Sequence, residues 1–338
     1  MTRLRQGYGA AGPFTEGLNR VKRAPWIVMG VWASTLLLAM PLGIALHEQL
    51  EAHLGASMAA ESAASGVNYD WWNEFLAQAS GVGVSFVPAI LGFAAVMKNL
   101  SAVADTTALP AVIATAVAMN MLVSLFLAGG VLDRLARDRD VGAGAFFATC
   151  GVFAVRFMRL GLIAFAVYWM LFIQFHSWLF DALYPALIAD VTVERTAFFI
   201  RVGLYAVFAL PVCFFNILFD YAKIRSVVED RRSMVGAVVA SWRFITRHPT
   251  DVCGLYALNV LLFLVVIGIY YVVAPSGSAN LLAFAIGQIY IVLRVIVRLQ
   301  FTASQTALFQ GRLAHAGYVA RPIPTWPDSP AAEAIGPR

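Results

Sequence analysis

A seven-residue segment near position 50 contains two histidines and two glutamates, side chains that commonly bind metal ions. His47 and Glu51 are four residues apart, so they share one face of a helix. His53 lies about 240° around the helix from His47, and HEQLEAH differs from the H-E-x-x-H pattern of zinc proteases. The spacing favours an ordinary helix surface, and we predict neither a metal nor another cofactor.

Arg294 and Arg298 are charges inside the last long apolar run. Arg294 lies nine residues before Ala303, where the run ends, which is about 13 Å along a helix. A charge at that depth needs a side chain that reaches the interface, an ion pair, or a lipid phosphate. We predict an ion pair with Asp220, because both residues should lie in the cytoplasmic half of adjacent spans. Lipid phosphate is the alternative ligand.

Three of the uncharged polar residues inside apolar runs are candidate functional residues. Asn120 lies near the middle of its run, while Asn259 and Gln288 lie about a third of the way in. Such side chains usually bond to neighbouring helices, with about 0.6 kcal/mol each. A path for a polar substrate is the alternative. We therefore consider these residues candidate ligand or lipid contacts, together with the two arginines and Asp220.

An aromatic and acidic cluster precedes the second long apolar run. It consists of Tyr69, Asp70, Trp71, Trp72 and Glu74. Trp and Tyr favour the headgroup level of a membrane, which accounts for the aromatic residues. The alternative is a binding surface for a lipid headgroup, a sugar or a periplasmic partner, in which the carboxylates accept hydrogen bonds.

The composition of the chain is that of a membrane protein. Of its 338 residues, 60% are hydrophobic and only 13% are charged, against about 25% charged in soluble domains. The three cysteines form no C-x-x-C pair, so neither a disulfide framework nor a zinc site is indicated. The net charge of +5 arises from short clusters beside apolar runs, which indicates orientation in a membrane and no nucleic-acid partner.

Long apolar runs predict an all-α protein with six membrane-spanning helices. They lie near residues 26–47, 108–132, 158–180, 197–219, 252–274 and 281–303. A shorter stretch, 82–97, contains Pro88, and we expect a re-entrant or interfacial helix there. If this stretch crossed, a cluster of three arginines near residue 137 would move outside, against the preference of basic residues for the cytoplasm.

The charge distribution gives the predicted topology. Of the 24 basic residues, only Lys98, Arg195 and Arg201 fall on or near the outside. We therefore predict a membrane protein with both termini cytoplasmic. Its parts are a basic N-terminus (1–25), a six-helix membrane domain (26–303) with an outer segment (48–107), and a largely disordered cytoplasmic tail (304–338).

The six spans are expected to form three hairpins, each preceded by a basic, partly apolar stretch. These stretches begin at 17, 146 and 238, and we expect short helices in the cytoplasmic interface. In the first, Leu18 and Val21 should face lipid and Arg20 should face water. Near the third, anionic lipid headgroups should attract four arginines, each by about 1 kcal/mol: Arg231, Arg232, Arg243 and Arg247.

The strip from Asp220 to Arg232 should continue the fourth span into the cytoplasm as an amphipathic helix. Its mixed charges predict ion pairs such as Arg225 with Glu229, which are four residues apart. A solvated face is one interpretation, and a docking surface for another membrane or cytoplasmic protein is the other. The sequence has no Walker A loop, G-x-G-x-x-G or G-x-S-x-G motif, which lowers the expectation of an enzyme.

Two segments, FDYAKIRSVVEDRRSMVGAVVASWRFITRHP (219–249) and GVNYDWWNEFLAQASGVG (66–83), resemble stretches of uncharacterised multi-spanning bacterial inner-membrane proteins. The likeness covers most of the chain. The layout is more loosely similar to the membrane domain attached to some glycerophosphodiester phosphodiesterases, whose catalytic domain this sequence lacks. The resemblance implies a bacterial envelope protein and carries no known activity.

We therefore expect a non-enzymatic membrane component, that is a scaffold, an assembly factor or a permease-like subunit. The interfacial stretches and the charged strip favour it. A transporter of a small molecule or a lipid is the alternative, and it rests on the three polar residues inside the runs. An enzyme acting on lipid would need a nucleophile or a metal site, which the motifs do not indicate.

Overall fold

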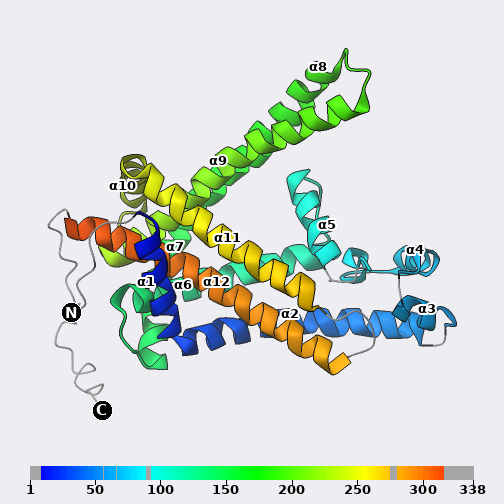
Figure 1. The fold of residues 1–338 in the computed structure, drawn as a ribbon, viewed down its shortest axis with the longest axis horizontal. Helices are drawn as coiled ribbons and strands as arrows, with labels where there is room; N and C mark the ends of the chain where they lie inside the picture. Colours follow the sequence, from blue (N-terminus) through cyan, green and yellow to red (C-terminus); the bar gives the residue numbers. More distant parts are fainter. Residues whose placement is uncertain (1–8, 56, 66, 89–92, 275–279, 316–338) are drawn as a thin grey trace.

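The computed structural model describes residues 9–315, apart from 56, 66, 89–92 and 275–279 (Figure 1). Every regular element within these residues is a helix, which confirms the predicted all-α class. Six of the helices are long and apolar enough to cross a membrane, as predicted. Their lengths are 25 to 46 residues, and about 20 suffice for the hydrocarbon core.

The six long helices have these bounds: α2 (Pro25–Leu54), α6 (Ala111–Arg137), α7 (Ala143–Trp169), α9 (Glu194–Val228), α11 (Pro249–Val273) and α12 (Asn280–His315). The third continues from α7 through two π-helical segments, η2 (Met170–Phe175) and η3 (Trp178–Leu183), into α8 (Tyr184–Ile188). The shorter elements are α1 (Ala11–Lys22), α3 (Ala59–Ser65), α4 (Tyr69–Gln78), η1 (Gly83–Ser85), α5 (Phe93–Ala104) and α10 (Met234–Arg247).

Two of the three basic lead-in stretches, the first and the third, form separate helices. The positions of two prolines explain why these two do so. α1 ends just before Pro25 and α10 just before Pro249, and each proline is the first residue of the following long helix. Proline suits that position and disfavours helical geometry in the residue before it. The second stretch, near 146–165, has no proline, so it belongs to one continuous helix. The prediction of a separate interfacial helix at the second stretch is therefore wrong.

Two predicted boundaries also need correction. The stretch 82–97 does not form one helix, because residues 83–85 make a single 3-10 turn and α5 begins only at Phe93. Residues 89–92 lie outside the described residues. The predicted tail begins too early, because α12 continues past residue 303 to His315 and residues 304–309 are all buried. The remaining tail, 316–338, lies outside the described residues.

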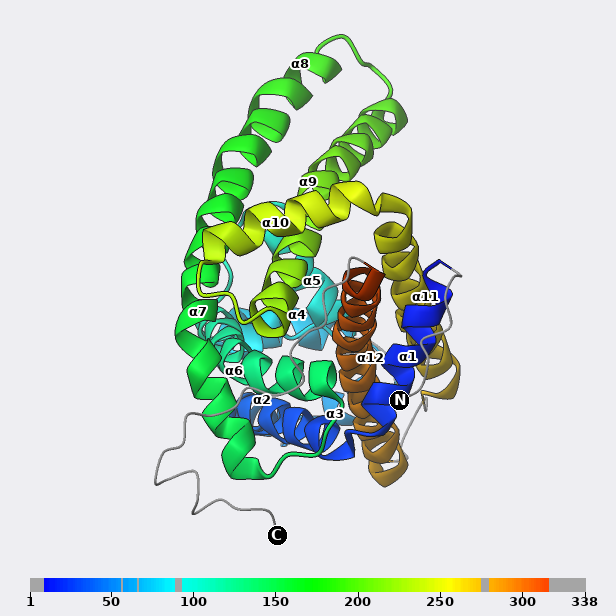
Figure 2. The same cartoon turned by 90° about the vertical axis from the view of Figure 1, so that its left-hand side faces the viewer.

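The best-buried part of the molecule lies where α1, α10 and the C-terminal part of α12 meet, which we call the basic end (Figures 1 and 2). α1 packs along α12 so closely that a Cβ on Gly17 would lie 2.7 Å from the backbone nitrogen of Ser304. Val21 packs with Val28 and Leu135, so it does not face lipid as expected. Only a glycine at position 17 permits the close approach of the α1 and α12 backbones.

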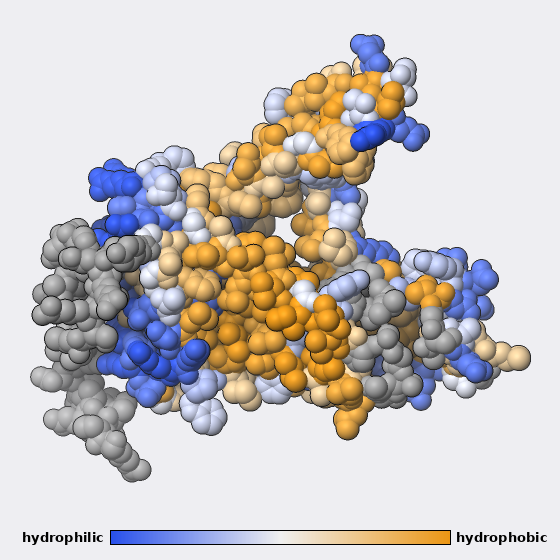
Figure 3. All heavy atoms as spheres, viewed as in Figure 1, coloured by the Kyte–Doolittle hydropathy of each residue, from blue (hydrophilic) through white to orange (hydrophobic). Residues whose placement is uncertain are grey.

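At the other end the hairpin of α8 and α9 separates from the remaining helices, and we call residues 170–210 the arm (Figure 1). Aromatic contacts hold the two helical sides of the arm together. Phe172 lies edge-on to Phe208 with ring centroids 5.1 Å apart, and Phe175 stacks on Phe208 at 6.2 Å. Figure 3 shows that the largely hydrophobic arm projects from the molecule with open space along part of its length, and contacts at Ala104 and Asp105 join it to the end of α5. The six long helices are therefore closely packed at the basic end, whereas the arm diverges from the others at the opposite end.

Candidate functional surfaces and cavity

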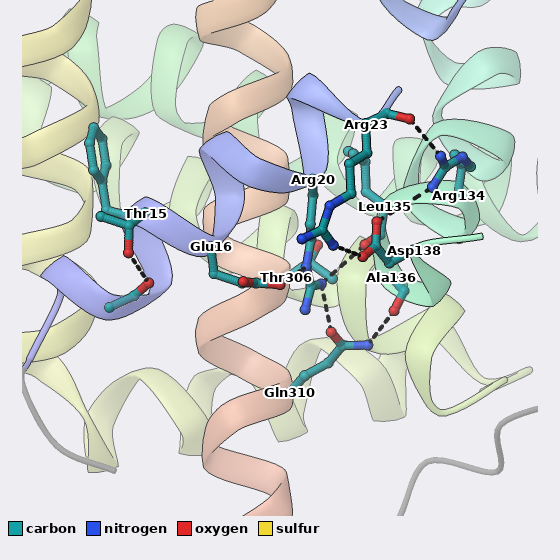
Figure 4. Close-up of polar contacts among 12 residues, drawn as sticks. Thr15, Glu16, Arg20, Arg23, Arg134, Leu135, Ala136, Asp138, Thr306 and Gln310 are labelled. Atoms are coloured by element: carbon teal, nitrogen blue, oxygen red, sulfur yellow. Dashed lines mark hydrogen bonds and ion pairs between the residues drawn. The ribbon is translucent and has the colours of Figure 1, made fainter. Parts of the chain in front are cut away.

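A buried arginine joins α1 to two other helices at the basic end (Figure 4). Arg20 is only 7% exposed, and its guanidinium donates to the carbonyl of Leu135 (3.0 Å), to Gln310 Oε1 (2.7 Å) and to Glu16 (3.1 Å). The carbonyl belongs to the last turn of α6, where such groups have no partner within the helix. The positive charge also suits a helix C-terminus. Arg20 therefore does not face water as expected, and it caps α6.

Gln310 and Arg134 complete this arrangement, which with Arg20 we call the clasp (Figure 4). Gln310 donates to the carbonyl of Ala136 (2.8 Å), so α12 caps the same end of α6. Arg134 is 5% exposed and donates to the carbonyl of Arg23 (2.8 Å) and to Asp140 (2.6 Å). Three side chains thus bond α1, α6 and α12 to one another, which fixes the basic end.

The predicted ion pair between Arg294 and Asp220 is wrong. Asp220 instead pairs with Lys223 (2.7 Å), and the hydroxyl of Tyr256 donates to it (2.9 Å). The guanidinium of Arg294 lies 5.7 Å from the centre of the Tyr290 ring, on its own helix one turn away. The side chain of Arg294 is therefore exposed and extends along α12 toward Tyr290. The binding of a lipid phosphate by Arg294 stays a prediction. Arg298 is also exposed on α12.

The three polar residues proposed to form a path do not converge. Asn259 is fully buried, and its amide donates to Ser304 Oγ (3.0 Å) and to the carbonyl of Leu255 (2.9 Å). Gln288 accepts from the indole of Trp32 (3.3 Å), which joins α12 to α2. Asn120 is exposed on α6. The first two residues therefore bond helices together, as the structural interpretation predicted.

α10 has one buried face and, on another side, an exposed apolar stripe. Its buried face, with Phe244 and Ile245, packs against α9 and neighbouring helices. The exposed stripe consists of Val235, Val239 and Trp242, which are 64%, 48% and 48% exposed. Their spacing of four and three residues places them on one helix face. The predicted basic residues beside this stripe are also exposed: Arg231, Arg232, Arg243 and Arg247.

The charged strip before α10 is more buried than predicted. Arg225 and Glu229 form the predicted ion pair at 2.8 Å, yet their side chains are only 15% and 6% exposed. Arg225 also donates to the carbonyl of Ala240 (3.0 Å), which ties α9 to α10. Arg231 makes a second ion pair with Glu229. A solvated helix face is therefore the wrong description of this strip.

The aromatic and acidic cluster at residues 69–74 divides into a buried and an exposed part. Trp71 is 6% exposed and its indole donates to His53 Nδ1 (3.0 Å), whereas that of Trp72 donates to the carbonyl of Phe86 (3.2 Å). Trp71 is thus part of a local core and no headgroup-level belt residue. Tyr69, Asp70 and Glu74 remain exposed. His47 and Glu51 lie 3.7 Å apart on one face of α2, as their spacing predicted.

A cavity that the sequence did not reveal lies between α5 and the arm. Its volume is about 490 Å³, and it is lined by Leu100, Ser101, Val103, Ala104, Asp105, Phe172, Tyr205, Phe208, Ala209 and Val212. Asp105 accepts from the hydroxyl of Tyr205 and pairs with Arg201 at 3.2 Å. The hydrogen bond from Tyr205 lowers the pKa of the Asp105 carboxyl below its ordinary value.

One further polar contact holds α5 against the arm. His176 is 5% exposed, and its Nε2 donates to the carbonyl of Ala104 at 2.7 Å. The two contacts at residues 104 and 105 thus secure the end of α5. His176 lies between the two π-helical segments η2 and η3, and π-helical turns are frequent at functional sites. The hydrophobic periodicity of the sequence does not reveal such turns. Neither Asp105 nor His176 was singled out, because their partners lie 72 to 100 residues away in sequence.

No protein family, curated protein or solved structure matches this chain. The resemblance to bacterial inner-membrane proteins and to the membrane domain of glycerophosphodiester phosphodiesterases therefore stays a prediction. What the chain does has to be inferred from its own surfaces and contacts.

Proposed function

We propose that this chain is a non-enzymatic bacterial inner-membrane protein, a scaffold, assembly factor or permease-like subunit, whose α10 binds the anionic cytoplasmic surface of the membrane. The basic end is then the cytoplasmic end, and both termini lie there. The observation that carries the proposal is the apolar stripe of α10 with exposed arginines next to it. The long helices would pair as three hairpins between the two membrane surfaces.

The placement of α10 suits this role. An amphipathic helix that lies in the interface needs an apolar face for the acyl-chain boundary and basic residues for the headgroups. α10 offers Val235, Val239 and Trp242 for the first requirement, and Arg243 and Arg247 follow around the same helix for the second. α1 differs, because Arg20 and Val21 are buried. We therefore assign the membrane-surface role to α10 alone.

The contacts inside the bundle favour this function over transport of a polar molecule. Asn259 and Gln288 are bonded to Ser304 and Trp32, so they hold helices together. A substrate path would require such groups to converge on one space. The exposed apolar stripe of α10 and the exposed arginines beside it lie together, which is the arrangement expected of a component that binds a surface or a partner.

A nitroxide label on α10 tests the membrane contact. Val239→Cys and Arg247→Cys are each made in a background where Cys150, Cys213 and Cys253 are alanine, and the labelled full chain is reconstituted with phosphatidylcholine or with phosphatidylglycerol. In phosphatidylglycerol we expect the label at 239 to collide with oxygen in preference to a water-soluble nickel complex. The label at 247 should show the reverse.

The contribution of charge is tested by replacing Arg231, Arg232, Arg243 and Arg247 with Gln, and separately with Lys. The Gln variant should raise nickel access at 239 in phosphatidylglycerol, and the effect should shrink at high salt because exposed charges are screened. The Lys variant is the matched control and should behave as the parent. Equal nickel access at 239 and 247 in both lipids would contradict the proposal.

Epitope tags test the orientation independently. Tags at residues 60 and 190 should report from outside, and tags at 140, 235 and 325 from the cytoplasm. The reason is the accumulation of basic residues at one end of the bundle. An outside signal at residue 140 would overturn the assigned topology, whatever the behaviour of α10.

A further inference from the structure

The cavity between α5 and the arm has the volume of a ligand site. At about 490 Å³ it lies within the range of roughly 300–1,000 Å³ that small-molecule sites occupy. Two elements far apart in sequence form its walls, α5 on one side and the first half of α9 with Phe172 on the other. One wall belongs to α9, which is among the six helices long and apolar enough to cross a membrane.

The polar and apolar groups of the cavity are separated along its length. On α9 the lining residues are Tyr205, Phe208, Ala209 and Val212, which share one face through spacings of three, four and seven. From Tyr205 to Val212 this face runs about 10 Å. Asp105 and Arg201 meet the hydroxyl of Tyr205 at one end, and beyond them the face is apolar.

We propose that this cavity holds one acyl chain of a membrane amphiphile, with the polar end of the amphiphile beside Asp105, Arg201 and Tyr205. Water is a poor occupant, because it needs two to four polar partners and the walls beyond Tyr205 offer none. A chain of methylenes restores the dispersion contacts that an unfilled apolar space lacks. The single polar end matches an amphiphile whose headgroup lies toward the outer surface.

The wall formed by α5 is held in a way that suits a binding site. His176 bonds the carbonyl of Ala104, and Asp105 is held by Tyr205 and Arg201. These contacts lie at the polar end of the cavity, whereas Leu100 and Val103 are 56% and 41% exposed. The cavity is therefore open at these two residues of α5, which lets a chain enter from the side.

The experiment measures binding of two probes to the purified full chain in detergent by native mass spectrometry. Dioleoyl phosphatidylglycerol represents a membrane lipid and oleate represents a free fatty acid. We expect saturable retention of one molecule of at least one probe. Ala209→Trp fills the cavity and should weaken retention at least tenfold. Ala206→Trp makes the same change at an exposed position outside the cavity and should retain the probe as the parent does.

The two probes distinguish the source of the chain. Tighter retention of phosphatidylglycerol identifies a membrane lipid, and tighter retention of oleate identifies a free fatty acid. If Ala209→Trp does not give a monodisperse protein, Val212→Trp fills the apolar end of the same cavity and takes its place. Retention that is equal in the parent and the filled variants, or retention by none of them, overturns the inference.

Discussion

The basic end and the arm end of the molecule are stabilised differently. At the basic end Arg20, Arg134 and Gln310 bond directly to helix-end carbonyls or carboxylates, and Gly17 brings α1 against α12. At the arm end aromatic contacts dominate, and a cavity remains beside Tyr205. Buried polar groups fix a geometry because each is costly to leave without a partner. The arm end has fewer such constraints, so it can accept a ligand.

The largest expected effect tests the clasp. Arg20→Met keeps the length of the side chain but leaves the carbonyl of Leu135 and the amide oxygen of Gln310 without their donor. Each of the two unsatisfied groups costs about 1–3 kcal/mol, so we expect a loss of about 2–6 kcal/mol in unfolding free energy. Denaturation of the purified protein in mixed detergent and SDS micelles measures it.

Lys22→Met is the control for that variant, because Lys22 is exposed on the same helix. It should stay within about 0.5 kcal/mol of the parent, as surface substitutions usually do. Equal losses for the two variants would show that the clasp does not stabilise the basic end.

The next effect tests the close approach of α1 and α12. Gly17→Ala places a Cβ 2.7 Å from the Ser304 nitrogen and 2.9 Å from its Cα, and both are backbone atoms. Overpacking of this kind costs about 1–3 kcal/mol, which outweighs the gain in helix propensity of up to about 1 kcal/mol. Thermal unfolding in detergent, followed by circular dichroism, should show a lower midpoint.

Gly12→Ala provides the matched control on the same helix, because a Cβ at that position meets no atom within 4 Å. There the helix propensity acts alone, so the midpoint should be unchanged or slightly higher. A midpoint for Gly17→Ala at or above that of Gly12→Ala would mean that the two helices are further apart than described.

A smaller effect is expected at the arm end. His176→Phe keeps a ring of similar shape and removes the hydrogen bond to the carbonyl of Ala104. The loss should be about 1 kcal/mol, and it should be local because α5 has few other contacts with the arm. Hydrogen exchange of the amides of residues 96–104 should become faster while exchange at the basic end stays the same.

His47→Phe is the control for this variant, because the His47 side chain is 75% exposed on α2. It should leave exchange in α5 unchanged. Faster exchange throughout the molecule in His176→Phe would instead show that the arm and the basic end unfold together, which would remove the distinction between them.

The smallest effect concerns pH. The folded-state pKa of Asp105 is lowered, so its contribution to stability is complete above the unfolded value of about 3.9 and is lost as pH falls through the lower folded value. Hydrogen exchange of α5 should therefore accelerate, after correction for the intrinsic rate, as the pH is lowered below about 4. Asp105→Asn should remove this dependence. An identical pH profile in parent and variant would show that Asp105 does not secure α5.

Much of the architecture follows from the sequence alone, because it depends on short-range rules. Apolar runs of sufficient length predicted six long helices, and the structure has six. The four-residue spacing of Arg225 and Glu229 predicted an ion pair, which is present. Pro25 and Pro249 each begin a new helix, and the chain around residue 150, which lacks a proline, does not break. These features depend on neighbours within about one helical turn.

Only the tertiary structure decided which faces of the helices meet. Arg20 reads as a water-exposed residue of an interfacial helix, yet it is buried because Leu135 and Gln310, more than a hundred residues away, supply its partners. Asp220 took Lys223 and Tyr256 in place of Arg294. A membrane helix that is apolar all round carries no pattern that marks its packing face. The sequence therefore determined the six long helices and the starts of two of them at proline, whereas long-range packing determined the clasp and the cavity.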